Sequence, residues 1–126
     1  FYLFDVQAHS ITSTKDLKGN HVEGGQLLLA MWQGPDRLTA KGNEVVFGYG
    51  GNDSIDASGG TGGNTLYGGQ GNDTMIGSTK DLIFGDKGND LLLAGKACTL
   101  NGGLGNDYIN ASTGAGGNVL YGGQDN

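Results

Sequence analysis

Large apolar residues recur along most of this chain at steps of eight or nine residues, with two longer steps of eleven. The series consists of Leu29, Leu38, Val46, Ile55, Leu66, Met75, Ile83, Leu92, Leu100, Ile109 and Leu120. Because successive side chains of a strand point to opposite faces, each of these residues and its two neighbours can form a short strand with one side chain facing inward. The pattern therefore predicts an all-β protein in which many short strands of similar length wind into a coil.

Glycine-rich loops separate these strands and follow a nine-residue pattern, G-G-x-G-x-D-x-U-x, where U is the large apolar residue. Two copies fit without departure, at residues 68–76 and 102–110. Two further copies depart only at the second glycine, which is Tyr49 in one and Asp86 in the other. The glycines permit backbone dihedral angles that are closed to other residues, so the loops can be tight.

The residue two places before each apolar position differs between alternate units. One series is Asp36, Asp53, Asp73, Asp90 and Asp107, and the other is Leu27, Glu44, Asn64, Asp81, Cys98 and Asn118. Two units make one turn of a flattened coil, so alternate loops stack on the same edge. We therefore expect a ladder of aspartates along one edge and a mixture of residues along the other.

The aspartate edge is the candidate metal site, because carboxylate and loop carbonyl oxygens suit a hard cation such as calcium. Four of its loops share the triplet G-N-D: Gly51-Asn52-Asp53, Gly71-Asn72-Asp73, Gly88-Asn89-Asp90 and Gly105-Asn106-Asp107. Asp36 extends this ladder, and Asp81 is the one aspartate of the opposite edge. We expect several Ca²⁺ ions, mainly along the aspartate edge.

On these motifs the chain resembles the RTX (repeats-in-toxin) family of secreted bacterial proteins. The resemblance is strong over residues 48–126 and extends more weakly back to about residue 24. It implies a parallel β-roll, a form of β-helix solenoid, with calcium held between successive loops. It also implies type I secretion from Gram-negative bacteria, folding outside the cell, and an extracellular or cell-surface location. The loops at Asn64, Cys98 and Asn118 match the position of the family's metal ligand but not its residue type.

We divide the chain into residues 1–23, a less regular N-terminal segment, and residues 24–126, the β-roll. Residues 1–6, FYLFDV, are aromatic and β-prone. They can cap the open end of the coil, which solenoids need. Alternatively, they can pair as a strand with the edge of another molecule. The chain starts at Phe1 and stops within a repeat, which suggests a processed product or an excised piece.

Composition narrows the possible functions. The chain has 126 residues, 27 of them glycine, and its glycines follow a nine-residue period rather than the Gly-X-Y period of collagen. A net charge of −6 argues against nucleic acid as a partner, because that binding needs a basic surface. No run of eighteen apolar residues occurs, so no transmembrane helix is expected. The single cysteine, Cys98, cannot form an internal disulfide and is expected to be a buried apolar side chain.

Apolar residues also fall on strand positions that should face outward: Leu82 and Phe84 on one sheet, and Leu91 and Leu93 on the other. A contiguous exposed apolar patch marks a partner surface, although scattered apolar residues are normal. No catalytic motif stands out, so the chain is not expected to be an enzyme. We interpret it as an extracellular structural protein that folds on calcium and self-associates into a surface layer, matrix or filament. The alternative is a calcium-binding module of a larger secreted enzyme, toxin or adhesin. Outward threonines are too few and irregular for an ice-binding lattice.

Overall fold

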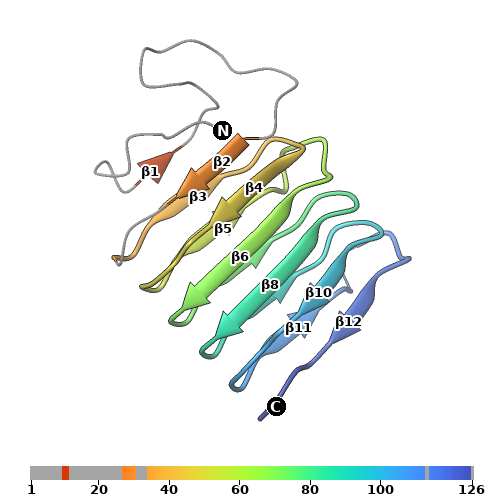
Figure 1. The fold of residues 1–126 in the computed structure, drawn as a ribbon. Helices are drawn as coiled ribbons and strands as arrows, with labels where there is room; N and C mark the ends of the chain where they lie inside the picture. The colour runs from red at the N-terminus through yellow and green to blue at the C-terminus, as the bar shows by residue number, and fades with distance from the viewer. Residues whose placement is uncertain (1–9, 12–26, 31–33, 113, 126) are drawn as a thin grey trace, which may run out of the picture.

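The residues that the structure describes form two parallel sheets of six strands each (Figure 1). The computed structural model describes residues 10–11, 27–30, 34–112 and 114–125. One sheet contains β1 (Ser10–Ile11), β3 (Arg37–Thr39), β5 (Ser54–Asp56), β7 (Thr74–Ile76), β9 (Leu91–Leu93) and β11 (Tyr108–Asn110). The other sheet contains β2 (Leu27–Ala30), β4 (Glu44–Phe47), β6 (Thr65–Gln70), β8 (Leu82–Lys87), β10 (Thr99–Asn101) and β12 (Val119–Tyr121).

The chain alternates between the two sheets, so each strand pairs with the strand two places away in the sequence. The apolar residues pair with one another in register: Ile55 with Met75 on one sheet, and Leu66 with Ile83 on the other. This arrangement is the parallel β-roll that the sequence predicted, and it winds from the N-terminal to the C-terminal end without a helix among the described residues. In that part of the chain, accordingly, no helix is long and apolar enough to cross a membrane.

The core is one column of side chains on each sheet, facing the other sheet. Its members are Leu38, Val46, Ile55, Leu66, Met75, Ile83, Leu92 and Leu100, all at most 2% exposed. Ala40, Ala57, Ala94 and Cys98 complete it, so the expectation that Cys98 is a buried apolar side chain is confirmed. Each turn therefore buries only two large side chains, which leaves much of the fold to be held by backbone pairing and loop contacts.

The C-terminal end of the coil is open among the described residues. Leu120 belongs to the same column as the fully buried Leu100, with which it pairs in register, yet it is 45% exposed. Its neighbours Val119 and Tyr121 are exposed as well. In the inner turns the equivalent side chains, such as Leu100, are covered by the turn that follows.

Near the other end, β1 lies within residues 1–23. Its backbone pairs with that of β3, with Ile11 in register with Leu38. The division of the chain between residues 23 and 24 stays a prediction. Residues 1–6, with their two interpretations as a cap or an exchanged strand, lie outside the described residues.

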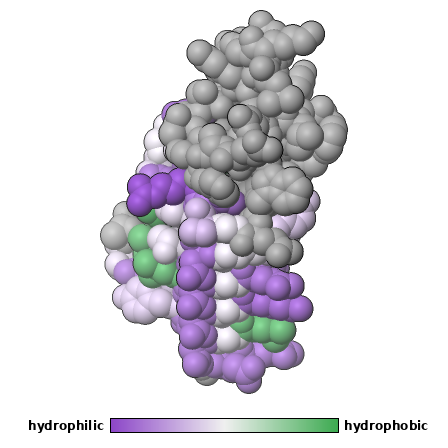
Figure 2. Space-filling view, turned by 90° about the vertical axis from the view of Figure 1, so that its left-hand side faces the viewer, coloured by the Kyte–Doolittle hydropathy of each residue, from purple (hydrophilic) through white to green (hydrophobic). Residues whose placement is uncertain are grey.

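The four apolar residues expected on the outer faces do not form one surface. Leu82 is 36% exposed, whereas Phe84, Leu91 and Leu93 are partly covered. Leu82 and Phe84 belong to β8, and Leu91 and Leu93 belong to β9 in the other sheet. Figure 2, which faces one edge of the coil, shows hydrophilic residues as a continuous column and hydrophobic residues only as separate spots. On this side of the molecule there is no broad apolar patch.

Candidate metal centre

The aspartates predicted to form a ladder lie immediately before successive strands of one sheet. Asp36, Asp53, Asp73 and Asp90 precede β3, β5, β7 and β9, and each is at most 2% exposed. Asp107 precedes β11, which is the last described strand of that sheet. Because the strands pair in register, the loops that carry these residues stack one turn above another.

Hydrogen bonds join each aspartate to the next turn. The backbone N–H of Asp53 donates to Oδ1 of Asp73 at 2.8 Å, and the N–H of Asp73 donates to Oδ1 of Asp90 at 2.8 Å. The same bond joins Asp36 to Asp53 at 3.0 Å and Asp90 to Asp107 at 2.9 Å. One carboxylate oxygen of each side chain thus holds successive turns together, which leaves the other oxygen for a different task.

The second oxygen is buried and lacks a donor in the inner turns. Among the described residues, Oδ2 of Asp53, Asp73 and Asp90 has no hydrogen-bond partner within the protein. A buried polar atom without a partner is costly, and a buried charge is more so. Three such oxygens at equivalent places therefore indicate that something outside the protein chain compensates them.

Each of these oxygens points at the first glycine of its own repeat. A Cβ placed on Gly68 would collide with Oδ2 of Asp73 and would lie 2.8 Å from the carbonyl oxygen of Gly85 in the next turn. Gly48, Gly85 and Gly102 stand in the same relation to Asp53, Asp90 and Asp107. A carboxylate oxygen and a carbonyl oxygen thus converge beside each glycine. The repeat pattern alone gives these first glycines only a conformational role, although their fixed spacing of five residues before the aspartate is a signal of this contact.

The glycines predicted at the metal loops, Gly51, Gly71, Gly88 and Gly105, all have positive φ. Gly71 (φ 122°) lies so close to the carbonyl of Gly51 that a Cβ would collide with it, and Gly88 and Gly105 repeat this contact one and two turns later. Only glycine permits both the dihedral angle and the close approach. These residues shape the loops through the backbone.

The asparagines of the same loops form a ladder of their own. Oδ1 of Asn52 accepts the backbone N–H of Asn72 at 2.8 Å, and Oδ1 of Asn72 accepts that of Asn89 at 2.9 Å. Asn89 and Asn106 continue the series at 2.8 Å. These side chains are exposed and already bonded to protein, so the arrangement gives them a structural role between turns. Their direct participation in metal binding remains only a prediction.

Burial raises the proton affinity of three ladder aspartates, Asp53, Asp73 and Asp90. It raises the pKa of Asp53 to about 7 and that of Asp90 to about 6, although a backbone N–H from the preceding turn offsets part of each rise. Burial also raises the pKa of Asp73, and the nearby Asp86 carboxylate adds to the effect. Keeping these groups charged without a cation therefore costs free energy.

The opposite edge is satisfied by the protein itself. Oδ1 of Asp81 accepts the backbone N–H of Asn64 at 2.8 Å, and Oδ2 accepts the backbone N–H of Ser78 at 2.6 Å. Glu44 accepts the N–H of Lys41, and Asn118 accepts that of Cys98. In the described part of the chain, no buried side-chain oxygen on this edge lacks a donor. Asp81, which the sequence offered as a metal ligand, therefore differs from the ladder aspartates.

The aspartate edge fits a cation that takes most of its ligands from the backbone. Within the described residues, no three His, Cys, Asp or Glu side chains converge on one point. The converging atoms are instead one carboxylate oxygen and one loop carbonyl per turn, all of them hard oxygen donors. Calcium suits this set, because it accepts six to eight oxygen ligands with flexible geometry.

Comparison with known families found one match. The family described as the RTX calcium-binding nonapeptide repeat (4 copies) matches residues 38–61, 56–79 and 99–116. Comparison with curated proteins gave no match, and comparison with solved structures gave none either. The matched ranges include the loops of Asp53 and Asp73 and the loop of Asp107.

Proposed function

Because the chain belongs to the RTX family of calcium-binding nonapeptide-repeat proteins, whose repeats bind Ca²⁺ in the turns of a β-roll, we propose that it is an extracellular structural protein that folds on calcium and then self-associates. Proteins with these repeats are typically secreted, which supports the extracellular location. The β-roll repeat is a structural calcium-binding element and not a catalytic one. The assembly would be a surface layer, matrix or filament.

One observation carries the calcium-dependent folding: the buried, donor-less Oδ2 atoms of Asp53, Asp73 and Asp90. We assign the calcium ligands to these oxygens, to the equivalent oxygen of Asp107, and to the carbonyls of the glycines that face them. Bound calcium would supply positive charge to the carboxylates and would be coordinated by the Oδ2 atoms of Asp53, Asp73 and Asp90, which accept no hydrogen bond within the protein. The narrow core and the glycine-rich loops make the calcium-free coil weak, since ordering glycine costs more entropy than ordering other residues.

Apolar side chains on the outer faces of the sheets support self-association. Leu82 is 36% exposed on β8. Phe84 on the same strand, and Leu91 and Leu93 on β9, are partly covered. These residues give a lateral route by which folded molecules can pack against one another.

Circular dichroism and sedimentation velocity test the two halves of the proposal separately. We expect β-structure to appear in millimolar calcium and to disappear in EDTA, and larger species to appear only in calcium. Replacing Leu82, Phe84, Leu91 and Leu93 with threonine should keep the calcium-induced β-structure, since threonine suits strands, while it reduces association. Identical spectra with and without calcium would refute calcium-dependent folding.

The second candidate is a calcium-binding module of a larger type I-secreted enzyme, toxin or adhesin. The match to the RTX calcium-binding nonapeptide repeat favours it, because such repeats form calcium-binding modules of secreted proteins. A protein that folds in calcium and yet stays monomeric at high concentration would support this candidate over the structural one. Replacing Leu82, Phe84, Leu91 and Leu93 with threonine would then leave its sedimentation unchanged.

A further inference from the structure

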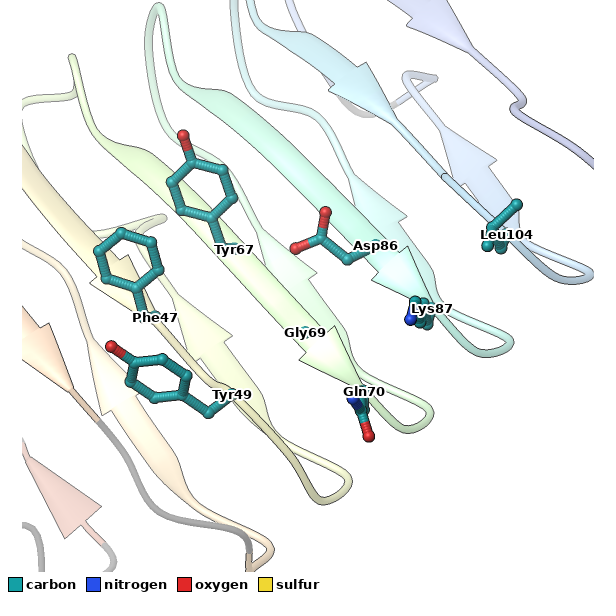
Figure 3. Close-up of a pocket in the computed structure, with 8 residues that line it drawn as sticks. All are labelled: Phe47, Tyr49, Tyr67, Gly69, Gln70, Asp86, Lys87 and Leu104. Carbon is teal, nitrogen blue, oxygen red and sulfur yellow. The ribbon is translucent and has the colours of Figure 1, made fainter.

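A groove crosses the outer face of the sheet that contains β4, β6 and β8 (Figure 3). Its floor is Gly69, and Tyr49 and Asp86 stand on either side of it on the neighbouring strands or their extensions. Tyr67 and Phe47 border the groove towards the middle of the strands, and Gln70, Lys87 and Leu104 border it towards the loops. None of these side chains belongs to the calcium ligands proposed above.

Tyr49 and Asp86 are the two departures from the nonapeptide pattern at its second glycine. Both have positive φ, 69° and 75°, in a column where Gly69, Gly103 and Gly123 have the same left-handed conformation. Side chains are disfavoured there, and such local strain clusters at binding and catalytic sites. At Gly69 itself, a Cβ would collide with the carbonyl of Tyr49, so the floor stays empty. The two costly side chains thus create the walls of a space that a regular repeat would lack.

Aromatic rings form the apolar side of this space. Phe47 and Tyr67 stack with their centroids 4.8 Å apart, and Tyr67 and Phe84 stack at 5.0 Å, so the faces between them are covered. Tyr49 packs beside Phe47 at 5.7 Å and remains 54% exposed. Tyr49 is therefore the ring on which a ligand can lie, supported from behind by a stacked row.

The polar side of the groove has no net charge. Asp86 contributes one negative charge and Lys87 one positive charge, while the Gln70 amide both donates and accepts hydrogen bonds. The backbone of Gly69 donates to the Asp86 carboxylate and holds it over the floor. Lys87 would repel a cation in the groove, and Asp86 would repel an anion. The lining instead suits a neutral ligand with one apolar face and several hydroxyl groups.

We propose that this groove binds a neutral pyranose ring of an extracellular saccharide, with the apolar face of the sugar on Tyr49 and its hydroxyls bonded to Asp86, Gln70 and Lys87. The groove residues directly precede the candidate calcium loops, so they come together only when the roll is folded. The saccharide site rests on calcium-dependent folding for its assembly, and not on self-association.

The test is an NMR titration of the isotope-labelled protein in saturating calcium. The probes are the methyl pyranosides of glucose, galactose and mannose and N-acetylglucosamine, with tetramethylammonium and glucuronate as charged comparisons. At least one neutral sugar should shift the amide signals of Gly69 and Gln70 and the ring signals of Tyr49. If none of the four sugars shifts them, or if a charged probe shifts them more strongly, the proposal is wrong.

Two variants restore the regular repeat and should fold normally: Tyr49→Gly and Asp86→Gly. Each should weaken sugar binding by roughly tenfold, because it removes an aromatic face or a charged hydrogen-bonding partner. Lys80→Gly, which relieves a positive φ of 56° on the opposite edge, is the matched control and should bind like the parent protein. Circular dichroism of each variant in calcium separates loss of the site from loss of the fold. Unchanged binding in both variants would overturn the assignment.

Discussion

Replacing one ladder aspartate by asparagine should make stability less dependent on calcium, whereas the same replacement on the opposite edge should not. Asp73 and Asp81 are a matched pair, because each is 1% exposed and each accepts a backbone N–H at Oδ1 at 2.8 Å. Asparagine keeps that bond in both places. The two positions differ at Oδ2, which has no partner in Asp73 but accepts the N–H of Ser78 in Asp81.

The size of the effect follows from the linkage between binding and folding. An ion with a Kd of about 10⁻⁴ to 10⁻³ M stabilises the fold by roughly 1.4–2.7 kcal/mol at about 10 mM free calcium. Asp73→Asn should lose one ion. The difference in free energy of unfolding between this variant and the parent protein should therefore grow by about 1.4 kcal/mol for each tenfold rise in calcium concentration. In Asp81→Asn an amide N–H would meet the N–H of Ser78, which costs about 1–3 kcal/mol at every calcium concentration.

Urea unfolding followed by circular dichroism, repeated over a series of calcium concentrations, gives both free energies of unfolding. The difference between Asp73→Asn and the parent protein should grow with calcium, and the difference for Asp81→Asn should stay constant. If the two differences have the same dependence on calcium, then calcium does not discriminate between the edges, and the one-sided ladder is wrong.

Other properties should follow from the same site. In EDTA, the residual stability of the fold should increase as the pH falls from about 7 towards 4, which thermal melts across this range would measure. The reason is that the raised pKa values of Asp53 and Asp90 let the folded state bind more protons than the unfolded state. In calcium, acidification should raise the calcium concentration at the folding midpoint, since protons compete for the same oxygens. Gly71→Ala should prevent calcium-induced folding, because Gly71 has a φ of 122° and a Cβ there would collide with the Gly51 carbonyl. Gly59→Ala is the control, because its Cβ would point into open space, and circular dichroism should show it folding as the parent protein does. Magnesium should not replace calcium in the same assay, since it demands octahedral geometry and keeps its water.

The sequence was sufficient for the repeating framework. Apolar residues at regular steps fixed which side chains face inward, and the register of Ile55 with Met75 and of Leu66 with Ile83 agrees with it. The same spacing placed the aspartates in one column before the strands of one sheet. These features are periodic, so each copy of the repeat supports the others.

Features that depend on contacts between turns were not visible in the sequence. Turns differ in length, so Gly69 lies beside Tyr49, twenty residues earlier, and beside Asp86, seventeen residues later. The pattern gave no reason to connect these three residues, and so it missed the groove. It also could not tell which oxygen atoms already have donors, such as Oδ2 of Asp81 and Oδ1 of Asn72, and which have none.

Anomalous diffraction from a crystal grown in calcium would locate the bound ions themselves. We expect calcium peaks within coordination distance of Oδ2 of Asp53, Asp73 and Asp90, and none beside Glu44, Asn64 or Asp81. Peaks of equal strength along both edges, or well-ordered aspartate loops without any calcium peak, would contradict this expectation.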